Sequence, residues 1–154
     1  MKALIISDSH HETKLLQKII DFEYPFDYIF FCGDGLEGLF KVSYPGKCRV
    51  NAVSGNVDLY LQLKTPLQIV DKFEGKILFM CHGNRHNVKA SLDSLIYDAH
   101  SKNADIVFFG HTHIQHYSVE GSLQIFNPGA VVLGSYGIAE IFDGLWTFHH
   151  RCFV

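Results

Sequence analysis

The sequence predicts an α/β fold in its first two thirds and a β-rich end, arranged as two packed sheets flanked by helices. Short apolar runs recur along the chain and lead into polar loops, which is typical of buried strands. Residues 13–22 and 88–100 repeat apolar side chains at helical spacing. From residue 114 onward no helical period is present and glycines are frequent, which favours antiparallel strands.

The first elements alternate between strand and helix. The apolar run 2–6 predicts a strand, residues 13–22 predict the helix that follows, and Tyr24-Pro25 ends that helix. Residues 28–31 and 49–53 predict two further buried strands, and both run into loops that contain glycine. This part of the chain is therefore expected to form a sheet with helical crossovers.

The remaining elements complete the two sheets. A hairpin is predicted through Glu74-Gly75, and a strand at residues 105–109 follows the helix at 88–100. The expected strands of the hairpin and of the chain end are 67–70, 76–80, 124–126, 138–141 and 145–148. No repeat or linker interrupts the chain, so residues 1–154 are expected to form a single domain with a full core.

Composition and charge exclude several classes of protein. The net charge is −3 and lysine and arginine are scattered, so extended nucleic-acid binding is not expected. The apolar stretch at residues 3–6 is too short for a signal peptide or a membrane span. Four cysteines without a CxxC pair favour a reducing compartment. We therefore expect a cytoplasmic protein without membrane attachment.

Polar side chains follow five of the predicted strands. Because loops at the carboxyl ends of strands converge on one crevice in α/β sheets, these side chains are expected to face one another. Imidazole, carboxylate and amide donors without thiolates suit Zn, Mn, Fe or Ni, and their number suffices for two ions. The seven candidate donors are Asp8, His10, Asp34, Asn56, His82, His111 and His113.

Six short motifs carry a family resemblance. In order they are DxH at 8–10, GD at 33–34, GNxD at 55–58, HG at 82–83, GHTH at 110–113 and NPG at 127–129. Together they resemble the calcineurin-like metallophosphoesterases, most closely the small single-domain phosphodiesterases of bacteria and archaea. The resemblance implies a four-layer α-β-β-α sandwich of two mixed sheets flanked by helices.

The resemblance also implies a dinuclear metal centre. One divalent ion would be held by Asp8, His10, Asp34 and His113, and a second by Asp34, Asn56, His82 and His111, with Asp34 as the bridge. Mn²⁺ is the preferred ion, and Ni²⁺, Zn²⁺, Fe²⁺ and Mg²⁺ stay open. The implied reaction is hydrolysis of a small phosphodiester or nucleotide by a metal-bridging hydroxide, with Asp34, Asn56 and His82 as catalytic residues.

One departure from the family concerns the general acid. Larger members have GNH where this chain has Val57, so another acid such as His86 or His11 would be needed, or substrates with good leaving groups. Arg85 and His86 are candidate contacts to the substrate phosphate, together with Asn56, although a solvated loop explains the first two equally well. Asp58 is either a support for Asn56 or a turn residue.

Two other interpretations of the sequence are alternatives to the phosphodiesterase hypothesis. Residues 33–38 match GxGxxG, but Asp34 and Glu37 would repel a pyrophosphate, so a dinucleotide fold is not favoured. The second is a catalytically silent scaffold, because a retromer subunit of eukaryotes resembles this family in fold and serves mainly as a scaffold. The complete set of donors favours the enzyme. A homodimer is left open.

Overall fold

The computed structural model describes residues 1–61 and 64–154 and contains two five-stranded sheets. The first sheet has the order β10-β9-β1-β2-β3 and the second has the order β4-β5-β6-β8-β7. The first consists of β1 (Lys2–Ile6), β2 (Tyr28–Phe31), β3 (Arg49–Ala52), β9 (Ser135–Phe142) and β10 (Leu145–Cys152). The second consists of β4 (Gln68–Phe73), β5 (Lys76–Cys81), β6 (Ile106–Phe108), β7 (Gln115–Glu120) and β8 (Leu123–Pro128).

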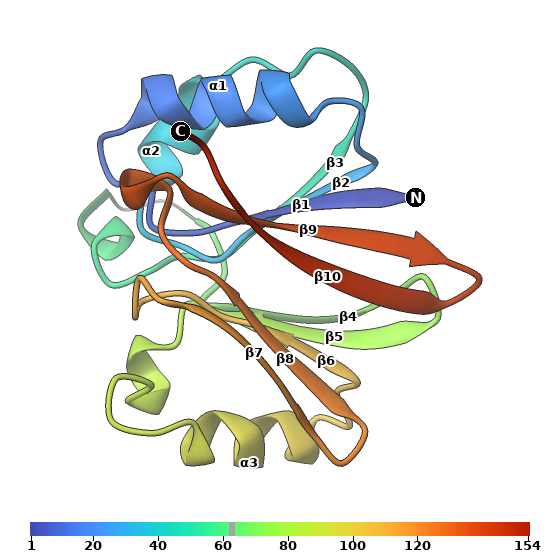
Figure 1. Cartoon of the computed structure of the whole chain (residues 1–154). Coiled ribbons are helices and arrows are strands. Elements are labelled where there is room, and N and C mark those ends of the chain that lie inside the picture. Colours follow the sequence, from blue (N-terminus) through green and yellow to red (C-terminus); the bar gives the residue numbers. More distant parts are fainter. Residues whose placement is uncertain (62–63) are drawn as a thin grey trace.

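Helices cover the outer face of each sheet. The helices α1 (Thr13–Glu23) and α2 (Leu36–Lys41) lie on the first sheet, and α3 (Asp93–Ser101) lies on the second (Figure 1). Three short 3₁₀ turns, η1 (Asp58–Leu61), η2 (Asn84–His86) and η3 (Val131–Leu133), occur in the connecting loops. The predicted four-layer α-β-β-α sandwich of two mixed sheets is therefore confirmed.

Strand direction brings the candidate ligands to one edge of the sandwich. In the first sheet β1, β2 and β3 are parallel, and in the second β5, β6 and β8 are parallel. The loops that follow β1, β2, β5 and β6 all lie on the same side of the molecule, opposite the β4–β5 and β9–β10 turns (Figure 1). This shared edge is where the strand-end polar residues meet.

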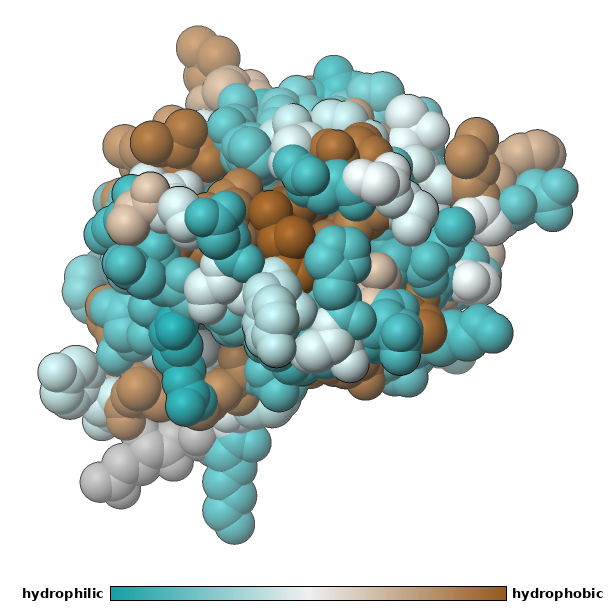
Figure 2. Space-filling view, turned by 90° about the horizontal axis from the view of Figure 1, so that it is seen from below, coloured by the Kyte–Doolittle hydropathy of each residue, from teal (hydrophilic) through white to brown (hydrophobic). Residues whose placement is uncertain are grey.

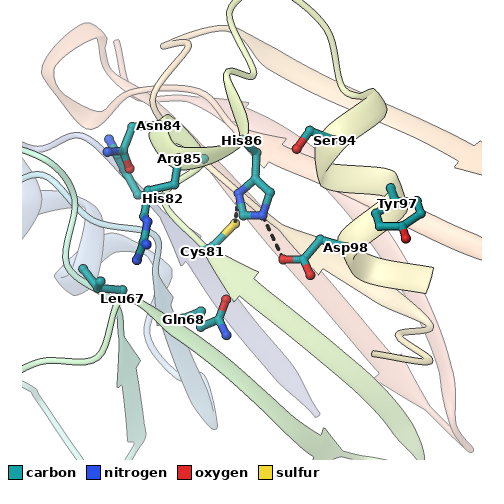
Figure 3. A pocket seen from close by; sticks show the side chains of 11 residues that line it. Leu67, Gln68, Cys81, His82, Asn84, Arg85, His86, Ser94, Tyr97 and Asp98 are labelled. Carbon is teal, nitrogen blue, oxygen red and sulfur yellow. Dashed lines mark hydrogen bonds and ion pairs between the residues drawn. The ribbon is translucent and has the colours of Figure 1, made fainter. Parts of the chain in front are cut away.

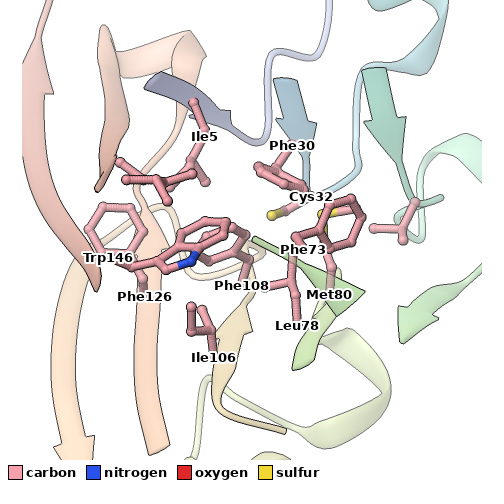
Figure 4. Close-up of a cluster of buried hydrophobic side chains, with 14 residues drawn as sticks. Ile5, Phe30, Cys32, Phe73, Leu78, Met80, Ile106, Phe108, Phe126 and Trp146 are labelled. Carbon is pink, nitrogen blue, oxygen red and sulfur yellow. The ribbon is translucent and has the colours of Figure 1, made fainter. Parts of the chain in front are cut away.

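The central core fills the space between the two sheets. Successive strand side chains point to opposite faces, so Ile5 packs between the sheets while Leu4 and Ile6 pack under α1. Aromatic rings dominate the centre of this layer, where Phe108 lies 5.3 Å from Phe30 and 6.3 Å from Trp146 between ring centroids (Figure 4). Close packing of these rings fixes how the two sheets sit on each other.

The outer face on the α3 side is mainly polar. Leu95 and Ala99 of α3 are fully buried against the second sheet, and most of the other residues of this helix are polar. Seen from this side, hydrophilic side chains cover most of the surface, with smaller hydrophobic patches between them (Figure 2). Among the residues that the structure describes, no helix is long and apolar enough to cross a membrane.

The structure differs from the sequence prediction at several elements. The helix predicted to begin at residue 88 begins at Asp93, because residues 87–90 form a turn in which Asn87 is left-handed at φ 51°. β7 was not predicted, since it is an edge strand in which only Tyr117 and Val119 alternate with polar residues, and both are about half exposed. β8 pairs in parallel with β6 as well as antiparallel with β7. β3 is an edge strand and only partly buried.

Candidate metal centre

The loops that carry the candidate ligands have an unusual backbone conformation. Five of the seven predicted donors are non-glycine residues with positive φ, a conformation that few such residues adopt. Strained residues of this kind persist where the surrounding structure holds them, and they concentrate at functional sites. They are Asp8 (φ 52°), His10 (φ 45°), Asp34 (φ 60°), His111 (φ 66°) and His113 (φ 60°).

One cluster joins the first loop to the GHTH loop. Each of Asp8, His10 and His113 offers a ligand atom within 4.8 Å of the other two. His113 Nε2 lies 3.1 Å from Asp8 Oδ1 and 3.4 Å from His10 Nε2. Three donors that converge so closely, with the carboxylate fully buried, have the chemistry of a divalent-cation site.

A second cluster lies directly beside the first. Asp34, His82 and His111 again offer ligand atoms within 4.8 Å of one another. His82 Nε2 lies 3.1 Å from Asp34 Oδ2 and 3.2 Å from His111 Nδ1. His82 Nε2 is also only 3.9 Å from Asp8 Oδ1 of the first cluster. The two clusters therefore form one continuous centre, with His111 and His113 of a single loop divided between them.

Neighbouring groups orient the two carboxylates. Asp8 Oδ2 accepts the hydroxyl of Ser7 and the backbone N–H of His111, which leaves Oδ1 facing the centre. Asp34 Oδ1 accepts the backbone N–H of Val57 at 2.8 Å, which leaves Oδ2 facing His82. Each aspartate thus presents one oxygen to the centre and uses the other to hold its side chain in place.

A backbone carbonyl sets the tautomer of His82. The buried Nδ1 of this residue donates to the carbonyl oxygen of Cys32 at 2.7 Å, so Nε2 is the atom available as a donor to a metal. Burial lowers the pKa of His82, but its hydrogen bond to Asp34 and the charge of Asp8 outweigh burial and raise the pKa above its ordinary value. For Asp34, burial raises the pKa, and the hydrogen bond and charge of His82 more than offset this and lower it.

Asn56 carries the polar atom that best tests whether the centre fits a metal. Its Oδ1 is buried and has no hydrogen-bond partner among the residues the structure describes. An unpaired buried amide oxygen is costly, because it has lost its water without a replacement. Its chain neighbours Gly55 and Val57 both contact Asp34. A cation held by that carboxylate would offer a partner to an amide oxygen of the same loop, so the donor set fits the divalent ion that the sequence predicted.

Two glycines allow the loops to approach closely. A Cβ on Gly55 would lie 2.0 Å from Asp34 Oδ1, and a Cβ on Gly33, at φ 96°, would lie 2.6 Å from the backbone nitrogen of Gly55. Neither position can accept a side chain without moving the carboxylate or the neighbouring loop. The GD and GN motifs therefore place glycine where the loops of the second cluster touch.

Asp58 supports the loops of the centre through their backbone. Its buried carboxylate accepts the N–H groups of Asp34, Gly35, Leu36 and Gly55 at 2.7–3.0 Å. No hydrogen bond joins it to the Asn56 side chain within the described residues. Asp58 is thus more than a turn residue, but it fixes the two loops rather than the Asn56 amide directly.

The residues after His82 line a cavity beside the centre. Arg85 is exposed on its rim, whereas both ring nitrogens of His86 are engaged, Nε2 by Asp98 Oδ2 at 2.9 Å and Nδ1 by Cys81 Sγ at 3.8 Å (Figure 3). Val57 and His11 are exposed. Of the two candidate phosphate contacts, the geometry thus favours Arg85.

Sequence reasoning missed two supporting contacts. The hydroxyl of Ser7 donates to Asp8 Oδ2. Asn127 Nδ2 donates to the carbonyl oxygen of Gly110 at 3.0 Å and to the hydroxyl of Thr112 at 3.1 Å, and these two bonds stabilise the GHTH loop. Asn127 belongs to the NPG motif, so that motif was the available signal. Ser7 gave no signal, because a serine beside an aspartate is common in loops.

Two adjacent Asp/His clusters are the arrangement of donors that two-metal hydrolases use. Residues 1–142 match the calcineurin-like phosphoesterase superfamily domain, and the chain belongs to this family. It is 34% identical over 134 residues to the probable metallophosphoesterase YsnB of Bacillus subtilis, and the match covers 86% of this chain and 76% of that protein.

Two solved structures share the fold at low sequence identity. One is a novel archaeal phosphodiesterase with TM-score 0.73 and 19% identity, covering 98% of this chain and 100% of that one. The other is a single mutant of Vps29 from Entamoeba histolytica, with TM-score 0.75, 18% identity and 100% of both chains covered. The fold therefore occurs both in an enzyme and in a vacuolar protein sorting protein.

Proposed function

We propose that this protein is a dinuclear metal-dependent phosphodiesterase. The observation that carries the proposal is the pair of adjacent Asp/His clusters, together with the unpaired buried oxygen of Asn56 on a loop whose Val57 N–H binds Asp34. Membership in a metallophosphoesterase family and the relation to a probable metallophosphoesterase support the same reaction class. Mn²⁺ is the preferred ion, with Ni²⁺, Zn²⁺, Fe²⁺ and Mg²⁺ as alternatives.

The ligand sets follow the two clusters. Asp8, His10 and His113 would hold one ion, Asn56, His82 and His111 would hold the other, and Asp34 would touch both. When bound, such ions supply Lewis acidity, which activates water and offsets charge on a phosphate. Asp34 suits the bridging role because its Oδ2 faces His82, whose Nε2 also lies 3.9 Å from Asp8 Oδ1 of the first cluster.

The chain's own residues would position the substrate and limit its range. The Arg85 guanidinium, exposed beside His82, would bind a non-bridging phosphate oxygen. Val57 cannot donate a proton to a leaving group, and both nitrogens of His86 are already engaged. We therefore propose that the enzyme prefers esters whose leaving groups depart without protonation.

The domain organisation, substrate size and cellular location of the enzyme are also part of the proposal. We propose a single domain acting on a small phosphodiester in the cytoplasm. The reducing compartment is supported by the four cysteines, none of which forms a disulfide. The alternative is a scaffold that uses the fold without turnover, as the likeness to Vps29 in fold allows.

The test is metal-dependent hydrolysis of bis-p-nitrophenyl phosphate, with p-nitrophenyl phosphate assayed in parallel. Protein stripped of metal is refilled separately with Mn²⁺, Ni²⁺, Zn²⁺ and Mg²⁺, and Asp34→Asn is compared with the matched surface variant Asp71→Asn. We expect diester turnover that requires metal, is absent in Asp34→Asn and is unchanged in Asp71→Asn.

Two results would contradict the proposal in different ways. Metal binding without turnover of either ester would favour the scaffold. Turnover of the monoester alone would keep the reaction class and overturn the diester preference.

A further inference from the structure

Two cavities flank the second cluster and share a wall. The larger cavity, of about 660 Å³, lies between β5, η2 and α3 and begins at His82. The smaller cavity, of about 230 Å³, begins at Ser54 and Gly55. Leu67, Asn84 and Arg85 line both. The two cavities therefore lie on either side of this shared wall. They adjoin the loops that carry two of the candidate ligands, His82 and Asn56.

The shared wall between the cavities carries a positive charge. Among the described lining residues, Arg85 is the only lysine or arginine of either cavity. Asp98, at the α3 end of the larger cavity, binds His86 through one oxygen (Figure 3). Its other oxygen binds Lys102. Within the described lining the larger cavity thus offers no second lysine or arginine for another phosphate, and Asp98 is already paired. A ligand with one negative charge in its middle and neutral arms matches this pattern.

The larger cavity presents polar and aromatic groups without internal partners. The side chains of Gln68, Ser94 and Tyr97 line it, and none makes a side-chain hydrogen bond within the residues the structure describes. Tyr97 is 79% exposed, so its ring is free to stack on a ligand. A volume of about 660 Å³ lies within the range of roughly 300–1,000 Å³ usual for small-molecule sites. The smaller cavity would hold only a compact group.

We propose that these cavities hold the two ester substituents of a phosphodiester, with its phosphate at Arg85 and a nucleoside in the larger cavity against Gln68 and Tyr97. This inference rests on the proposed function and names its substrate class, a nucleoside phosphodiester with a small second substituent. A base would stack on the Tyr97 ring, and the amide of Gln68 can both donate to and accept from its edge.

The first experiment compares two diesters with the same leaving group. Thymidine 5′-(p-nitrophenyl phosphate) and methyl p-nitrophenyl phosphate both release p-nitrophenolate and both carry a single negative charge. We expect kcat/KM for the thymidine ester to be higher by about tenfold or more, because stacking of one base contributes that order of affinity. This ratio should fall towards one in Tyr97→Ala and in Gln68→Ala. The matched control is Phe142→Ala, an exposed aromatic in the β9–β10 turn, which should keep the ratio.

The second measurement is independent of catalysis. Adenosine is titrated into the metal-free protein and binding is followed by saturation-transfer NMR, with Tyr97→Ala and Phe142→Ala beside the native chain. We expect saturation transfer to adenosine with the native chain and with Phe142→Ala, and none with Tyr97→Ala. Absence of transfer to adenosine in the native chain, or equal kcat/KM for the two diesters, would overturn the nucleoside site. Adenosine binding without any ester turnover would keep the site and refute only the proposed reaction.

Discussion

The carboxylate of Asp58 accepts the backbone N–H of Asp34 at 2.7 Å, and the same oxygen accepts that of Gly55 at 2.8 Å. One buried side chain therefore ties together the two loops that carry Asp34 and Asn56. Neither loop has a regular secondary structure that would hold it in this position, so Asp58 supplies hydrogen bonds that a helix or a sheet supplies elsewhere.

Asp58→Asn should destabilise the protein and weaken metal binding. Both carboxylate oxygens accept two N–H groups, so the amide nitrogen of asparagine would face two donors whichever way it turned. We expect a loss of about 2–4 kcal/mol in the free energy of unfolding and roughly 10- to 100-fold weaker Mn²⁺ binding. Chemical denaturation and Mn²⁺ titration measure these effects. Asp71→Asn on exposed β4 is the control, and equal behaviour of the two variants would show that the Asp58 network carries little energy.

Gly55→Ala should disturb the centre without a comparable effect elsewhere. Its new Cβ would meet Asp34 Oδ1 at 2.0 Å and displace the carboxylate. We expect Mn²⁺ affinity to fall by about tenfold or more. Gly121→Ala is the matched control, since its Cβ meets nothing within 4 Å and only its φ of 62° is unfavourable. Electron paramagnetic resonance of free Mn²⁺ reports both affinities, and unchanged affinity in Gly55→Ala would rule out Asp34 as a ligand in this position.

Arg85→Ala should reduce diester hydrolysis. Removal of a guanidinium that binds the phosphate would lower kcat/KM by about 10- to 100-fold, the effect of one charge-assisted hydrogen bond. Arg49→Ala, which removes an exposed arginine paired with Asp71, should leave hydrolysis unchanged. Steady-state kinetics with bis-p-nitrophenyl phosphate make the comparison. If KM and kcat were those of the native chain, Arg85 would have no role in substrate binding.

Phe108→Ala should destabilise the core between the sheets. The ring is fully buried and packs against Phe30, Phe126 and Trp146, so its removal leaves a cavity. We expect a loss of about 3–5 kcal/mol, against less than about 0.5 kcal/mol for the exposed Phe142→Ala. The single tryptophan is buried, so its emission follows unfolding. Similar midpoints for the two variants would contradict this account of the core.

The buried carboxylate of Glu23 should make the free energy of unfolding depend on pH in the acid range. Burial raises the pKa of its carboxyl, but hydrogen bonds from Lys2 and Tyr136 and the charge of Lys2 outweigh burial and lower the pKa. Because the folded pKa is below the unfolded one, the stabilisation is complete above the unfolded value and is lost as pH falls through the folded value. Glu23→Gln should cost about 1–2 kcal/mol near pH 7, and the difference from the native chain should shrink below about pH 4.5, the ordinary pKa of a glutamate side chain.

Denaturation at a series of pH values measures the Glu23 contribution. The exposed Glu12→Gln serves as the control for a general change in net charge. A difference between native chain and Glu23→Gln that stayed constant from about pH 7 to about pH 3 would contradict the assignment.

Local sequence patterns were sufficient to predict most strands and the candidate ligands. The apolar runs of β1, β2, β5 and β6 and the polar residues after them are features of consecutive residues, so the strands and the candidate ligands were predictable. The edge strand β7 was missed because only two apolar residues, Tyr117 and Val119, alternate in it. The helix α3 was predicted to begin too early because Val88 continues its apolar spacing, although the left-handed Asn87 and the turn after it keep this segment out of the helix.

The tertiary structure alone decided how the ligands are held. The bond of His82 to the Cys32 carbonyl, the tie of Asp58 to both loops and the contact of His113 with Asp8 depend on residues far apart in the chain. Hydrogen bonds and left-handed loop residues of this kind form only when separate strands are brought to one edge, because each contact needs a partner that the local sequence does not contain.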